Sequence, residues 1–127
     1  MIWNYQDILQ EFGMGTKKQH DEWMMRTFRY VAKLAFGEEE EYMWWNDSFG
    51  IEFDVDSAIT FMSDFVDHYP NAVLSITVVL DSICVKLSID NEDYVVKDYI
   101  DNDAHLNIFG MVIWAIAKSF GYKEELE

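Results

Sequence analysis

The stretch AVLSITVVLDSICVKLSIDNEDYVVKDY, residues 72–99, decides the fold. Apolar side chains alternate with polar or β-branched ones along residues 73–80 and again along residues 83–90, which is the period of a strand with one buried face. Asp81 and Ser82 suit a tight turn, and Asn91, Glu92 and Asp93 suit a second one before a third strand at residues 94–99. Neither turn has the length of a crossover helix, so residues 72–99 predict a three-stranded antiparallel meander.

Two helices are predicted before this meander. Four apolar residues recur at helical spacing near the start of the chain, and Gly13 follows them as a stop signal; they are Tyr5, Ile8, Leu9 and Phe12. Thr16 precedes Gln19 in the spacing of a capping box, which predicts the start of a second helix. Its apolar stripe is formed by Met24, Phe28, Val31 and Ala35, and Gly37 predicts its end.

Residues 41–55 predict a β-hairpin that joins the same sheet. Residues 42–45 are aromatic and β-prone, residues 46–48 are turn formers, and residues 49–55 alternate apolar with acidic side chains. Asp56 can then cap a third helix, which must end before Pro70 because the residue before a proline disfavours helical backbone. A last helix is expected after the aspartates Asp101 and Asp103, with Gly121 as its stop signal.

The expected fold class is therefore α+β. An antiparallel sheet, formed by a hairpin at about 41–55 and the meander at about 72–99, has about four helices packed on one face. A chain of 127 residues is typical of one domain, and no repeat or Pro/Gly-rich linker divides it. Residues 1–127 are expected to form that single domain.

The net charge of −15 restricts the classes of molecule that the protein is expected to bind. Eleven acids and no Lys or Arg lie between residues 34 and 85, so this segment alone carries −11. Residues 17–33 carry five basic residues against Asp21 and Glu22, a local +3, with Arg26, Arg29 and Lys33 on one helix face. Because such a field attracts basic proteins and repels nucleic acid and anionic membranes, we expect a basic protein partner, with no direct nucleic-acid contact and no membrane association.

The expected compartment is the cytoplasm. Cys84 is the single cysteine, so no intramolecular disulfide can form, and residues 1–7 lack the basic and apolar regions of a signal peptide. The longest apolar run, residues 108–117, is shorter than the roughly 20 residues that cross a bilayer.

Four side chains are candidates for chemistry. His68 follows Asp64 by four residues, His105 lies near two aspartates, and His20 neighbours two acids, but none of them has the further ligands that a metal or acid/base site requires. Helix-terminal or solvated positions are therefore the favoured explanation of the three histidines. Cys84 lies in a predicted strand without a nucleophile signature, which favours a packed thiol.

Motifs for cofactors are also missing from the sequence. Gly13 and Gly15 lack the third glycine and the Lys-Ser/Thr of a phosphate loop, and residues 90–93 lack the spacing of an EF-hand loop. We therefore expect no enzyme, no cofactor and no bound metal.

The leading functional hypothesis is an acidic inhibitor of the immunity-protein type. Such a protein neutralises a basic partner, a toxin nuclease or a defence nuclease, by covering its positively charged cleft, and complementary charge speeds and selects the association. In the predicted hairpin the carboxylates alternate with core residues and line one face. The expected partner-binding residues are Glu38, Glu39, Glu40, Glu41, Trp44, Trp45, Asp47, Glu52, Asp54 and Asp56.

The alternative is a non-catalytic adaptor or assembly protein that binds through an aromatic patch. Tyr42, Trp44, Trp45 and Phe49 are the candidates for this patch, because Trp and Tyr are enriched at binding hot spots. Core packing would explain the same residues. High salt separates the two hypotheses, since screening weakens electrostatic steering and leaves apolar contact intact.

Overall fold

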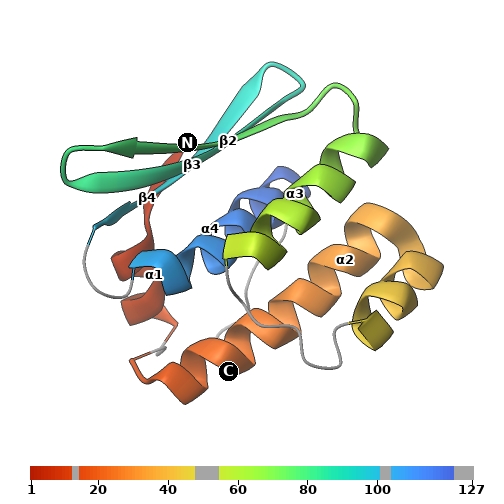
Figure 1. Cartoon of the computed structure of the whole chain (residues 1–127), viewed down its shortest axis with the longest axis horizontal. Coiled ribbons are helices and arrows are strands. Elements are labelled where there is room, and N and C mark those ends of the chain that lie inside the picture. The colour runs from red at the N-terminus through yellow and green to blue at the C-terminus, as the bar shows by residue number, and fades with distance from the viewer. Residues whose placement is uncertain (13–14, 48–54, 101–103, 122–127) are drawn as a thin grey trace.

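The structure is a computed structural model that describes residues 1–12, 15–47, 55–100 and 104–121, with the backbone alone for residues 38–47 and 104–106. The described elements follow the order β1, α1, α2, α3, β2, β3, β4, α4. The sheet forms one side of the molecule and the helices lie together on the other (Figure 1). This is the α+β class that the sequence predicted.

The predicted meander is confirmed. Strands β2 (Val73–Val79), β3 (Ser82–Ile89) and β4 (Glu92–Tyr99) are antiparallel neighbours, with Ile76 opposite Val85 and Val85 opposite Val96. Asp90 and Asn91 both have positive φ, 53° and 65°, as the two-residue hairpin turn between β3 and β4 requires.

The sheet is mixed rather than purely antiparallel, which corrects the sequence prediction. Strand β1 (Ile2–Asn4) pairs in parallel with β4, with Ile2 opposite Val95, and the strand order is β1-β4-β3-β2. The amino group of Met1 donates to the Asp93 carbonyl at 3.0 Å. Three residues are too few to show an alternating pattern, so the sequence carried no periodic signal for β1.

Helix α4 (Ala104–Ser119) lies at the centre of the molecule, between the sheet and the other long helices (Figure 1). Every residue from Asn107 to Ala117 is buried, against β3 and β4 on one side of the helix and against α2 and α3 on the other. A helix covered all round is expected to be apolar all round, which explains the uninterrupted apolar run of this segment.

The predicted start of the second helix is confirmed in its detail. Helix α1 (Tyr5–Glu11) precedes it, and α2 (Lys17–Asp47) begins directly after Thr16. The Gln19 backbone N–H donates to Thr16 Oγ1 at 3.2 Å, and the Thr16 N–H donates to Gln19 Oε1 at 3.1 Å. Both bonds of a capping box are therefore present.

Replacing Thr16 by alanine is expected to lower the free energy of unfolding by about 1 kcal/mol, because one N-terminal N–H of α2 loses its side-chain acceptor. Urea denaturation of the T16A and T16S variants measures this cost. The serine variant keeps a hydroxyl at the same place and should remain near wild type. Equal losses in T16A and T16S would show that the methyl group of Thr16, rather than the cap, carries the effect.

Residues 42–45 are helical, so the predicted hairpin at 41–55 is wrong in its first strand. Gly37 adopts φ 87° and ψ 173°, which kinks the backbone there, but the chain resumes the helix and continues to Asp47. Positive φ explains the glycine at this position. The rest of that hairpin, residues 48–54, lies outside the described residues.

Helix α3 (Val55–His68) follows and stops before Pro70, as predicted. Asp56 lies in its first turn rather than at the capping position, where the sequence prediction had placed it. The Tyr69 hydroxyl donates to the Ala35 carbonyl at 2.7 Å, and this bond ties the end of α3 to the part of α2 that precedes Gly37.

Candidate functional site

The structure brings few of the predicted binding residues together. Seven of them have helical backbone in the part of α2 that follows Gly37, and their side chains lie outside the description: Glu38, Glu39, Glu40, Glu41, Trp44, Trp45 and Asp47. Glu52 and Asp54 lie wholly outside the described residues. Asp56 is described and exposed. Of the three carboxylates predicted to line one strand face, Glu52 and Asp54 are therefore not described, and Asp56 lies in the first turn of a helix.

Helix α3 supplies an acidic surface in its place. Ala58, Phe61 and Phe65 are buried on its inner side. The outer side, here called the α3 face, has exposed residues at helical spacing: Asp56, Ile59, Thr60, Ser63 and Asp67. No Lys or Arg occurs between Val55 and His68, and Ile59 is 53% exposed among the polar residues. The α3 face thus combines carboxylates with one apolar contact point.

His68 lies at the C-terminal end of the same helix. Its Nδ1 is 3.1 Å from the Asp64 carbonyl oxygen, and its ring packs edge-on against Phe36, with centroids 4.7 Å apart. The hydrogen-bond distance to Asp64 and the contact with Phe36 give His68 a structural role at this end of the helix. The side chain of His105 is outside the description.

His20 is buried and bonded to a second buried residue. Its Nε2 lies 2.7 Å from the Tyr5 hydroxyl, its ring meets the Tyr5 ring edge-on, and it stacks beside Trp23. Burial lowers the pKa of His20, an effect that the charge of Asp21 partly opposes. Burial, together with the charge of Asp98, raises the pKa of Tyr5. A neutral imidazole with its proton on Nδ1 can therefore accept the hydrogen bond of the tyrosine hydroxyl.

Asp98 is a buried carboxylate that the sequence analysis did not single out. It is 2% exposed, and its Oδ1 accepts from Gln6 Nε2 at 3.0 Å and from the Tyr99 N–H at 2.9 Å. Its Oδ2 accepts from Asn107 Nδ2 at 2.8 Å. These bonds join α1, β4 and α4. The strand pattern offered a signal for this burial. Alternate residues of a strand face the same side of the sheet, so Asp98 shares the inward face of β4 with Val96, and the residues between them face outward and are more exposed.

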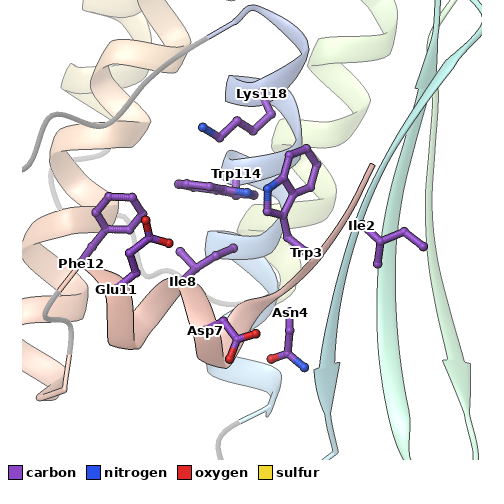
Figure 2. Close-up of a pocket in the computed structure, with 9 residues that line it drawn as sticks. All are labelled: Ile2, Trp3, Asn4, Asp7, Ile8, Glu11, Phe12, Trp114 and Lys118. Atoms are coloured by element: carbon purple, nitrogen blue, oxygen red, sulfur yellow. The ribbon is translucent and has the colours of Figure 1, made fainter.

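A pocket of about 300 Å³ lies between α1, β1 and α4. Figure 2 shows the indole of Trp114 between Phe12 and Trp3, and the ring centroids are 5.7 Å and 6.3 Å from that of Trp114. Asp7 and Glu11 stand one helical turn apart on its rim. Lys118 Nζ lies 4.5 Å from the centroid of the Trp114 ring. Aromatic faces and carboxylates suit a cation, and Lys118 already supplies one.

Cys84 is half-buried on β3, on the sheet face that points away from the helices, opposite Thr77 of β2 and Lys97 of β4.

Among the described residues, no group of three or more His, Cys, Asp or Glu side chains is arranged to hold a metal ion. Within the same part of the chain, no helix has the length and apolar character needed to span a bilayer.

The free edge of the sheet is apolar. Strand β2 is its outermost described strand on one side, and Val73, Val78 and Val79 are 63%, 66% and 55% exposed. Leu80, in the turn after β2, is 96% exposed. Val78 and Leu80 follow the alternation of the predicted strand but are not buried, because the described helices lie away from this end of β2 (Figure 1).

Comparison of the chain with protein-family models, with curated proteins and with solved structures finds no match in any of the three.

Proposed function

We propose that this chain is an acidic binding protein of the inhibitor or immunity type, which docks against a basic protein that acts on nucleic acid. The observation that carries the proposal is the α3 face, where Asp56 and Asp67 are exposed on a helix without any Lys or Arg. This helix lies inside the segment from residue 34 to residue 85, which carries eleven acids and no basic residue.

The physical argument is one of complementarity. Carboxylates spaced along one helix face present a row of negative charge, which is what a cleft built to hold phosphates attracts. Ile59 lies in the same row and is 53% exposed, so the surface can also bury apolar area on docking. Charge steers the approach, and the apolar contact slows dissociation.

A second candidate is an assembly protein that binds through apolar surface. The exposed side chains of Val78, Val79 and Leu80 favour this candidate, since they lie at one end of the sheet with Tyr99 and Ile100 also exposed. This surface differs from the α3 face, so mutations can separate the two candidates.

Charge reversal on the α3 face tests the first candidate. The D56K/D67K variant is expected to associate with the partner on the order of tenfold more slowly at low salt, because two steering charges are inverted. The partner is first captured from a lysate of the source organism at low salt, and association rates and its nuclease activity are then measured with purified components. Wild type should inhibit that nuclease stoichiometrically.

The matched control is D7K/E11K, which changes the net charge equally at two exposed positions of α1. The association rate of this control should remain much closer to that of wild type. Equal slowing in both variants would mean that total charge, rather than the α3 face, governs binding. An unchanged rate for D56K/D67K, with an intact circular dichroism spectrum, would remove the basis of the proposal.

A further inference from the structure

Within the part of the chain that the structure describes, the outer edge of β2 lacks the devices by which proteins protect an edge strand. Natural edges carry lysines, prolines or bulges, or are covered by another element. Residues 73–80 read VLSITVVL, with no charge and no proline. All seven residues of β2 pair in unbroken register with β3, so no bulge bends the strand away. Within the described residues, no strand pairs with its other edge.

This edge is also neutral in a chain whose net charge is −15. Two copies of so acidic a protein repel each other over most surfaces. Between Ala72 and Leu80, however, no ionisable side chain is present, and the nearest charge in sequence is Asp81. Association of two copies at β2 therefore avoids direct apposition of like charges.

The strand is complementary to itself in an antiparallel register centred on Ile76. In that register Val73 meets Val79 of the second copy and Leu74 meets Val78, so exposed valines become covered by β-branched or apolar partners. Ser75 meets Thr77, which pairs two hydroxyl side chains on the outer face. Asp81 meets Asn71 rather than another acid.

We propose that two copies of this chain form a symmetric dimer through antiparallel pairing of their β2 strands, which makes one continuous sheet of eight strands from the two four-stranded sheets. The same patch serves both copies, as a two-fold interface requires. Backbone hydrogen bonds across the two edges supply the affinity, and the register of side chains supplies the specificity.

Sedimentation equilibrium over a range of concentrations tests the proposal directly. Wild type is expected to double its mass as the concentration rises, and the β2 amides that point away from β3 should exchange hydrogen more slowly in the dimer. The amides of the Asp90-Asn91 turn, at the far end of β3, should exchange at an unchanged rate. A wild-type chain that stays monomeric throughout would overturn the proposal.

Charge complementation tests the pairing itself. In the proposed register Ser75 of one copy faces Thr77 of the other, so the S75D/T77D variant sets carboxylates against carboxylates, and S75K/T77K sets ammonium groups against ammonium groups. Each variant alone should therefore be monomeric, and an equimolar mixture should restore the doubled mass. The K97D variant is the matched control, because it makes the same change of two charge units as S75D/T77D on the same sheet face, but on the interior strand β4.

Circular dichroism confirms that each variant is folded. Dimerisation of S75D/T77D at the wild-type concentration would show that β2 is not the interface. Failure of the two variants to associate when mixed would exclude antiparallel β2 pairing in this register. Because these positions lie outside the α3 face, either result leaves the proposed inhibitor function standing, and loss of inhibition in D56K/D67K leaves the dimer standing.

Discussion

Replacing Gly110 by alanine is expected to destabilise the protein by about 2–3 kcal/mol, the upper part of the range for an overpacked core. Gly110 lies in the buried central helix α4, and an alanine Cβ there would overlap the Tyr5 hydroxyl oxygen and lie 2.8 Å from Tyr5 Cζ. Tyr5 is fully buried and is held by its bond to His20, so its ring cannot move aside cheaply. The better helix propensity of alanine, about 1 kcal/mol, offsets only part of this cost.

The Y5F substitution makes the test specific. Alone, Y5F leaves buried His20 Nε2 without its hydroxyl partner and is expected to cost about 1–2 kcal/mol. In the G110A/Y5F double variant the overlapping oxygen is gone, so the combined loss should be clearly smaller than the sum of the two single losses. Urea denaturation of the four proteins measures this coupling. Additive losses, or a G110A variant as stable as wild type, would contradict the close packing of Tyr5 on Gly110.

Replacing Asp98 by alanine is expected to cost about 3 kcal/mol of unfolding free energy, because unpaired buried donors carry a large penalty. The carboxylate is buried and accepts bonds from Gln6, Tyr99 and Asn107. Removing it leaves the Asn107 amide and the Tyr99 N–H without this acceptor. Gln6 is exposed and can bond to water instead.

Thermal or urea unfolding of D98A, N107A and the double variant separates the network from simple truncation. The two losses should be strongly non-additive, because the two side chains share one bond. Asp93 is the matched control: it is an exposed aspartate on the same strand, bonded by Ser88 Oγ at 2.7 Å and paired with Lys86 at 3.6 Å, and D93A should cost clearly less than D98A. Equal losses for D98A and D93A would show that burial of the Asp98 carboxylate contributes nothing.

The sequence predicted the elements whose periodicity is long and whose boundaries carry specific residues. Residues 72–99 alternate over three strands with turn residues between them, and both bonds of the Thr16 capping box are formed. Strand β1 escaped prediction because its three residues have no period, and because its partner lies more than 90 positions away, with Ile2 opposite Val95. Such a pairing depends on the tertiary structure and has no local signal.

The wrong prediction at residues 42–45 has a local cause. Aromatic residues favour strands only weakly, and a glycine that follows a helical pattern commonly indicates the end of the helix. In the structure Gly37 takes a positive φ and the helix then continues through the four glutamates, which are good helix formers. The predicted binding residues depended on that hairpin. Of these, Asp56 alone has a described side chain, and its exposure on α3 shifts the acidic surface from a strand to a helix.

The position of α4 has a consequence for how the chain reaches its native state. Helix α4, which fills the centre, comes last in the sequence among the described elements. Strand β4 pairs with β3, which directly precedes it in the sequence, and with β1, which lies at the start of the chain. A nascent chain that has made the meander still exposes Val85, Leu87 and Val96, which α4 will cover. Contacts between such distant residues slow folding, and an uncovered apolar sheet invites aggregation. Folding should therefore complete only after residues 104–119 have left the ribosome.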